Sequence, residues 1–224
     1  MRTTWDAAAA SEQVELYVGD RARGREELAG FLGRLGGDPS GGLCVELGCG
    51  LGRMTDALAE RFDRVLALDV SPAMLDQARK AVQASNVEFR LVSGAQLDSL
   101  DDGIADAVVC YLVLQHVPRR RIVLALLREI GRVLRPDGEA YLQLPVLDGG
   151  VRARGWRLFR ELALPLTSRL SPRPTAQAAY RGYRLTDAEL TRGMADAGLR
   201  VVARDEAAES PYRFSREVFL RVCR

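Results

Sequence analysis

The fold of this chain is decided by one short stretch, VELGCGLGR at residues 45–53. A short apolar run at residues 43–47 carries one acid, Glu46, and then breaks into three alternating glycines, Gly48, Gly50 and Gly52. Apolar residues at helical spacing follow directly. A strand, a glycine turn and a helix in this order are typical of open α/β sheets that bind nucleotide-like ligands above their strand ends. Glycine permits positive φ and lets a ligand approach the backbone closely.

The spacing of the glycines separates two classes of ligand. A dinucleotide-binding fingerprint, G-x-G-x-x-G, needs its last glycine at position 53, where this chain has Arg53. The chain reads G-x-G-x-G after an acid, which resembles motif I of the class I S-adenosylmethionine (SAM)-dependent methyltransferases of the type 11 and type 25 groups. The resemblance implies that this turn holds the methionine end of SAM, through Glu46, Gly48, Cys49, Gly50, Gly52 and Arg53.

Composition bounds the remaining classes of protein. A net charge of +2 gives no argument for nucleic acid, and Lys80 is the only lysine among 32 basic residues, as in chains from GC-rich genomes. No apolar run reaches the roughly 18 residues of a membrane span, and no signal-peptide core precedes the first strand. The four cysteines lack metal-ligand or disulfide spacing. We therefore expect a cytoplasmic protein with no metal site and no integral membrane segment.

A second acid follows the next predicted strand. Residues 64–69 form an apolar run that ends in Asp69, and Ser71 with Pro72 is a typical helix start. An acid at this strand end can accept both ribose hydroxyls of a nucleoside. The alternative is that Asp69 caps the next helix, but Ser71 fills that position. The segment D-x-S-x-x-M-L resembles the family's post-I region, which implies adenine contacts from Val70 and Met74.

The third strand, residues 87–92, leads into a departure from the family pattern. The family has an acid where this chain has Ser93, followed by Gly94 and Ala95. The resemblance places these three residues at the adenine ring. Because serine replaces the acid, we expect adenine recognition to depend more on the main chain.

The segment after the fourth strand carries the residues closest to the predicted chemistry. Residues 106–117 read D-x-V-x-x-x-x-x-L-x-H-V and resemble the family segment that faces the methyl group and the acceptor. The resemblance implies cofactor and substrate contacts from Tyr111 and a substrate contact from Gln115. His116 is the only histidine and the candidate general base, since its ordinary pKa near 6.5 suits neutral pH. Alternatively, His116 fixes the loop without moving protons.

The alternation of strands and helices continues to the end of the chain and predicts the fold class. A helix at 119–134, a turn at 135–138 and a strand at 139–145 match the family phrase EIGRVLRPDGE, and further strands follow at 199–204 and 217–222. Strands that alternate with helices form a mostly parallel sheet. We expect an α/β, Rossmann-like, doubly wound sheet, and the resemblance makes it seven-stranded, with an antiparallel last strand and helices on both faces.

Two segments lie outside this alternation. Residues 1–40 predict helices at 5–14 and 26–35, an N-terminal cap that in similar proteins covers the cofactor, with Tyr17 as candidate contact or ordinary packing aromatic. Within the main domain, 41–224, residues 146–184 carry eight arginines against two acids. We expect them to form a substrate lid, with Trp156 as a candidate substrate contact. An anionic acceptor, a membrane or lipid-like acceptor, and a merely solvated surface all fit its composition.

Together these motifs predict methyl transfer from SAM to a small-molecule acceptor at oxygen or nitrogen, with S-adenosyl-L-homocysteine as product. A non-catalytic SAM-binding protein is the first alternative, and a nicotinamide-dependent oxidoreductase the second. No N/D-P-P-Y-type motif or appended recognition domain points to nucleic acid or protein as acceptor.

Overall fold

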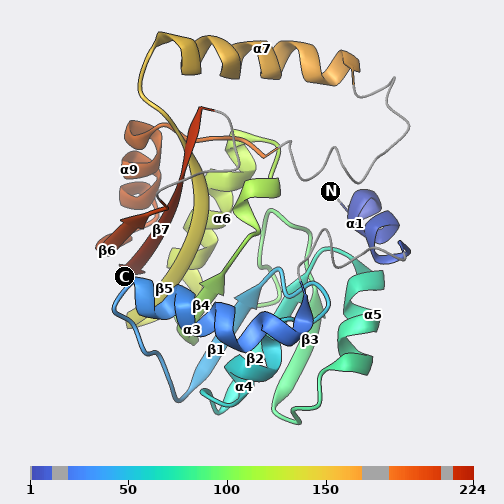
Figure 1. Ribbon diagram of the computed structural model, residues 1–224. Helices are drawn as coiled ribbons and strands as arrows, with labels where there is room; N and C mark the ends of the chain where they lie inside the picture. The colour runs from blue at the N-terminus through green and yellow to red at the C-terminus, as the bar shows by residue number, and fades with distance from the viewer. Residues whose placement is uncertain (1, 12–19, 168–181, 208–213) are drawn as a thin grey trace.

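The computed structural model describes residues 2–11, 20–167, 182–207 and 214–224, with residues 160–167 as backbone. A seven-stranded sheet of order β3-β2-β1-β4-β5-β7-β6 forms its centre (Figure 1). The strands are β1 (Leu43–Leu47), β2 (Arg64–Asp69), β3 (Val87–Leu91), β4 (Ala105–Cys110), β5 (Leu134–Leu147), β6 (Arg200–Glu206) and β7 (Ser215–Cys223). Only β7 runs antiparallel to its neighbours, β5 and β6. The predicted fold class is confirmed.

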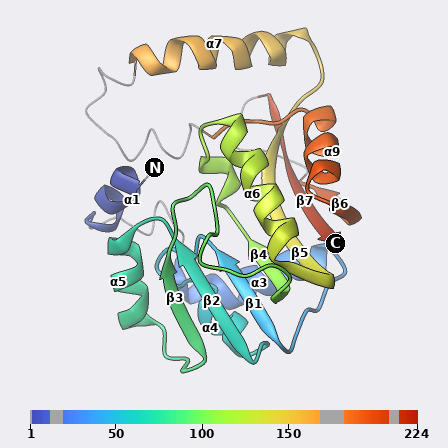
Figure 2. The ribbon, with the colours of Figure 1, turned by 180° about the vertical axis from the view of Figure 1, so that it is seen from behind.

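Helices cover both faces of the sheet. The described helices are α1 (Arg2–Ala9), α3 (Gly24–Arg34), α4 (Thr55–Ala59), α5 (Pro72–Ala81), α6 (Arg120–Val133), α7 (Val151–Thr167) and α9 (Asp187–Asp196). Side chains of α3, α4 and α5 form one core cluster with the sheet, and those of α6 and α9 form the other. The opposite view shows α6 and α9 in front of the strands (Figure 2). Within these ranges, no helix has the length and apolar character needed to cross a membrane.

The strand order places two loops side by side. β1 and β4 are neighbours, and the chain continues from β1 to β2 on one side and from β4 to β5 on the other. At such a switch point, the loops after the two central strands diverge and leave a crevice outside their carboxyl ends. Here those loops are the glycine turn after β1 and residues 111–117 after β4, which includes the short 3-10 helix η2 (Leu114–His116).

Three elements differ most from the predicted bounds. α1 covers residues 2–9 rather than 5–14, of which 12–14 lie outside the described residues. The helix after the glycine turn starts only at Thr55, because Gly50 and Gly52 have positive φ values of 54° and 78°, which an α-helix excludes. β5 starts at Leu134 rather than at 139, because the turn at 135–138 is absorbed as an irregularity in its pairing with β4, with Asp137 at a φ of 65°.

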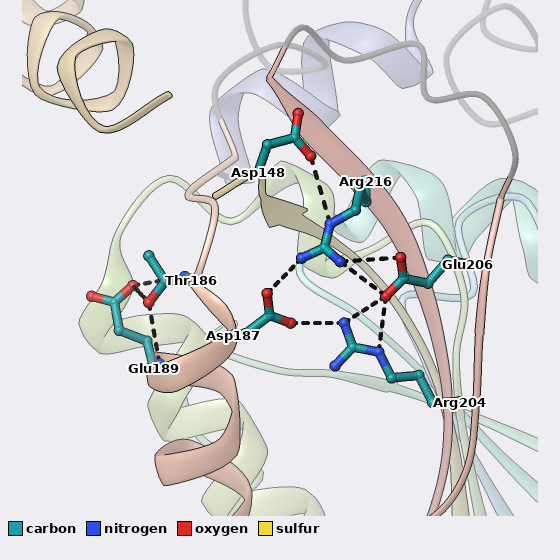
Figure 3. A network of polar contacts seen from close by, with 7 residues as sticks. All are labelled: Asp148, Thr186, Asp187, Glu189, Arg204, Glu206 and Arg216. Atoms are coloured by element: carbon teal, nitrogen blue, oxygen red, sulfur yellow. Dashed lines mark hydrogen bonds and ion pairs between the residues drawn. The ribbon is translucent and has the colours of Figure 1, made fainter. Parts of the chain in front are cut away.

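A network of charges holds the two ends of the segment 146–184 to the sheet (Figure 3). Asp148 follows β5, and Asp187 begins α9. Arg216 of β7 pairs with both and with Glu206 of β6, while Arg204 donates to Asp187 over 2.7 Å. An individual surface ion pair contributes little to stability. Here several pairs share Arg204 and Arg216, and together they fix the end of β5 and the start of α9 relative to β6 and β7.

The start of α9 also binds the first part of this segment. Thr186 and Glu189 form a capping box, in which Glu189 N–H donates to Thr186 Oγ1 over 3.2 Å. Arg157 of α7 donates to Glu189 over 2.9 Å, and Arg120 of α6 does so over 3.0 Å. α7 lies beyond the carboxyl edge of the sheet (Figure 1), and Arg157 links it to the start of α9 through Glu189.

Candidate active site

A pocket opens at the crevice between the two loops. Its volume is about 1040 Å³, including the open mouth. Its lining comes from the end of β1 and the glycine turn, from the end of β2 and the start of α5, from residues just after β3, from residues 109–117, and from one residue each of α1 and α6. Ligand pockets of open α/β sheets lie at this position. Residues as far apart in the sequence as Trp5 and Leu126 thus converge on one site.

The glycine turn packs tightly enough to require glycine at position 48. Gly48 has a φ of 78°, and a Cβ there would lie 2.3 Å from Val113 Cγ2 in the opposite loop. The amides of Gly48 and Cys49 both donate to the carbonyl of Leu68, over 2.8 and 2.9 Å. These two amides therefore fasten the turn to β2. Because both are already hydrogen-bonded, they are less available to a carboxylate of a ligand.

Asp69 joins the turn to the end of β2. Its Oδ2 accepts from the amide of Gly50 over 3.0 Å and its Oδ1 from the amide of Ser71 over 2.9 Å. Burial raises the pKa of Asp69, while these backbone hydrogen bonds act in the opposite direction. Each carboxylate oxygen has two lone pairs. Asp69 therefore keeps acceptor capacity toward the pocket that it lines.

Glu46 is a second buried acid in the lining, with 6% of its surface exposed. Thr55, the first residue of α4, donates its hydroxyl to Glu46 Oε2 over 2.6 Å. Burial raises the pKa of Glu46 to about 7, although the hydrogen bond from Thr55 and the charge of Arg53 lower it. Arg53 itself is paired with Glu27 of α3 and lies 5.5 Å from the ring centre of Tyr111. A cationic ligand group beside Glu46 would restore its ionised form.

The wall opposite the glycine turn consists of residues 111–117, and side chains of other strands hold it in place. Leu112 has a φ of 58°, which for a branched residue costs roughly 1–2 kcal/mol. Its amide donates to Oε1 of the fully buried Gln143 over 3.1 Å. Gln143 in turn contacts Gln115 and Glu217, and Gln115 contacts His116. Gln143 and Glu217 were not predicted from sequence, although a glutamine within the apolar strand YLQLPV was a detectable signal.

Helix α1 closes this wall from outside. The Trp5 ring meets His116 edge-on, with ring centres 5.0 Å apart and an interplanar angle of 78°. Ser71 Oγ donates to Asp6 over 2.6 Å, and Gln77 Nε2 donates to the carbonyl of Ala9 over 2.6 Å. α1 is thereby fixed to α5. The sequence suggested an aromatic of the N-terminal segment at the site, but Tyr17, the residue chosen, lies outside the described residues.

Most of the predicted site residues line this one pocket. They are Glu46, Gly48, Cys49, Gly50, Arg53, Asp69, Val70, Met74, Gly94, Tyr111 and His116. Gly52 is not in the lining and lies against Val82 instead. Ser93 and Ala95 are also outside it: the Ser93 hydroxyl accepts from the amides of Ala95 and Gln96, over 3.4 and 3.3 Å. The serine thus stabilises its own turn, and Gly94 alone of the three reaches the cavity.

The two predicted substrate contacts beyond Tyr111 lie behind or away from the pocket lining. Gln115 is buried, with 6% of its surface exposed, and faces His116 and Gln143. Trp156 packs against Phe214, with ring centres 5.9 Å apart, and against the guanidinium of Arg184. Its role toward a substrate stays a prediction.

Comparisons with known proteins agree with this geometry. The profile of the family described as methyltransferase domain matches residues 45–142. A ubiquinone biosynthesis O-methyltransferase from Xanthomonas oryzae pv. oryzae is 32% identical over 107 residues, which cover 47% of this chain and 44% of that protein. A protein of the same name from Pseudomonas paraeruginosa is 29% identical over 178 residues, or 79% of this chain and 68% of that one. The match to the Xanthomonas protein thus spans less than half of its length.

Among solved structures, a chain from the complex between the Haloferax volcanii Trm112 methyltransferase activator and a methyltransferase has a TM-score of 0.66. It is 22% identical, with 96% of each chain covered, and at that identity it supports the fold alone. The sheet order, the position of the pocket and the matching profile agree. Residues 45–142 therefore form a methyltransferase domain, whose cofactor is SAM, on a class I, Rossmann-like sheet.

Proposed function

We propose that this protein transfers a methyl group from SAM to a small-molecule acceptor, at oxygen or nitrogen, and releases S-adenosyl-L-homocysteine. One observation carries the proposal: two buried acids and an apolar wall with an imidazole share one pocket beneath Trp5. Such a pocket suits a cationic nucleoside on one side and a compact acceptor on the other.

The donor set of the pocket fits SAM. The remaining lone pairs of Asp69 suit the ribose hydroxyls, and Glu46 gains a cationic partner in the ammonium group. Val70 and Met74 supply apolar contacts for adenine, and Gly94 supplies main chain where the family has an acid. Bound here, SAM would supply an electrophilic methyl group on its sulfonium. The chain's own residues would hold it in one orientation toward residues 111–117.

The acceptor side would act mainly by alignment. Methyl transfer is an in-line displacement, and holding the reacting atoms in line contributes several kcal/mol, on the order of 7–11 in the best cases. His116 and Tyr111 are the polar side chains of this wall that line the pocket. The names of the Xanthomonas and Pseudomonas relatives favour oxygen as the methylated atom. We propose His116 as the residue nearest the acceptor's nucleophile, with general-base action or orientation as its role.

Residues 1–40 and 146–184 would serve as cap and lid. Support for the cap comes from Trp5 at the pocket. Support for the lid comes from the packing of its C-terminal end. A Cβ at Gly182 would lie 1.5 Å from the carbonyl oxygen of Gln115. The amide of Tyr183 donates to the carbonyl of Val117 over 2.7 Å. The lid's end therefore packs directly behind the wall that carries His116, where it can influence acceptor choice. A cytoplasmic setting without nucleic-acid partners stays a prediction.

Isotope transfer tests this proposal. The protein is incubated with methyl-labelled SAM and a cell extract separated into small-molecule, protein and nucleic-acid fractions. We expect label in the small-molecule fraction, and none with the Gly48→Ala variant, whose pocket is obstructed. Label confined to the protein or nucleic-acid fraction would contradict a small acceptor. Cofactor binding with no transfer to any fraction would favour the non-catalytic alternative.

A further inference from the structure

Four side chains form a continuous line from the sheet to the pocket. Glu217 of β7 accepts from Gln143 Nε2 of β5 over 2.5 Å, and the same nitrogen lies 3.4 Å from Gln115 Oε1. Gln115 Nε2 then lies 3.1 Å from His116 Nε2. Gln143 is fully buried and Gln115 nearly so, which limits competition from water. We propose that this line is a relay that holds His116 as the neutral tautomer with its proton on Nδ1.

The direction of the relay follows from its two unambiguous ends. The amide of Leu112 can only donate, so the atom of Gln143 facing it over 3.1 Å is the carbonyl oxygen. The carboxylate of Glu217 accepts, so the atom of Gln143 facing it is the NH₂ group. Both ends give the same orientation of the Gln143 amide. This assignment does not depend on distinguishing oxygen from nitrogen in the side chain itself.

The orientation of Gln143 sets the two residues beyond it. The second hydrogen of its NH₂ group points to Gln115, which must therefore present its oxygen to Gln143. The NH₂ group of Gln115 then faces His116 and donates to Nε2. A ring nitrogen that accepts carries no proton, so the proton of the neutral ring resides on Nδ1. Gln115, Gln143 and Glu217 are thus positioning residues that act through the imidazole.

This tautomer changes what His116 can do at the acceptor. The only lone pair of the neutral ring, on Nε2, is occupied by Gln115. Taking a proton there would require the Gln115 amide to turn, which would break its contact with Gln143. In this tautomer, His116 is therefore not set to remove the acceptor's proton at Nε2. The inference rests on the proposed function only for the nearness of His116 to the acceptor.

Nitrogen NMR tests the relay directly, because the chain contains a single histidine. The full-length protein is labelled with ¹⁵N, and the imidazole is observed at pH about 8.5, roughly two units above its ordinary pKa. Protonated and unprotonated ring nitrogens differ widely in chemical shift, and free neutral histidine carries its proton mainly on Nε2. We expect the reverse, with the proton on Nδ1. A proton on Nε2, or an even mixture, overturns the proposal without any variant.

Variants then identify the relay members. Gln115→Leu should return most of the population to the Nε2-protonated form, and Gln143→Leu should give a mixture, while Gln83→Leu on the exposed surface should change nothing. If both relay variants keep the wild-type tautomer, the relay is refuted; if Gln143→Leu does not fold, Gln115→Leu decides. The tautomer is measured without cofactor or acceptor. A failure here leaves methyl transfer standing, and a lack of methyl transfer leaves the tautomer standing.

Discussion

The two walls of the pocket are built in different ways. The cofactor wall consists of a glycine turn and two acids, fastened to β1 and β2 by backbone hydrogen bonds within 30 residues of sequence. The acceptor wall consists of residues 111–117, held by Gln143 of β5, Glu217 of β7 and Trp5 of α1. The first wall is encoded by one contiguous motif. The second is assembled from segments more than 200 residues apart.

This difference bears on how each wall can vary. A shared cofactor requires one unchanging geometry, and backbone contacts supply it independently of side-chain changes elsewhere. An acceptor differs from enzyme to enzyme, and side chains on distant elements can change one at a time. We therefore expect substitutions in the first wall to abolish binding, and substitutions in the second to alter rate and selectivity.

The largest effect is expected at Gly48. Gly48→Ala places a Cβ in the left-handed region and 2.3 Å from Val113. Strain and overlap together cost about 3 kcal/mol, or about a hundredfold in affinity for S-adenosyl-L-homocysteine. Calorimetry measures it. The matched control is Gly30→Ala on α3, where an added Cβ meets nothing within 4 Å; an equal loss of affinity there would refute the argument.

A second effect concerns pH and Glu46. Because the folded-state pKa, about 7, exceeds the unfolded value near 4.5, the folded protein is penalised as pH rises through that interval. Glu46→Gln removes the penalty, so its stability relative to wild type should increase from pH 4.5 to 8 by up to about 3 kcal/mol. Thermal unfolding across pH measures this. A constant difference between the two proteins would mean that Glu46 titrates normally.

A smaller effect should distinguish the acceptor wall. Trp5→Ala removes an aromatic contact worth about 1 kcal/mol, so methyl transfer should fall about fivefold while cofactor affinity changes little. Trp5→Phe should restore most of the rate. Trp156→Ala is the comparison variant, since Trp156 lies outside the pocket lining. Steady-state kinetics decide between them: a larger loss with Trp156→Ala would assign the acceptor contact to the lid.

The same contrast explains what the sequence could and could not predict. Glu46, the glycines and Asp69 were accessible because their function depends on local spacing along two successive strands and the turn and helix between them. Gln143 and Glu217 were not, because their pairing depends on β5 and β7 meeting in antiparallel register, Gln143 opposite Phe219. Ser93 shows a third case. A polar residue at the family's acid position was assigned to adenine, whereas its hydroxyl bonds to its own turn.

The central claim is that this pocket is a SAM site with Asp69 at the ribose. Calorimetric titration of the wild-type protein with S-adenosyl-L-homocysteine and with NAD tests it most directly. We predict one site for S-adenosyl-L-homocysteine, no heat with NAD, and affinity at least about tenfold weaker in a folded Asp69→Ala variant, as expected when a charged hydrogen bond is lost. Binding of NAD in place of S-adenosyl-L-homocysteine would contradict the account, and unchanged affinity in Asp69→Ala would show that the ribose lies elsewhere.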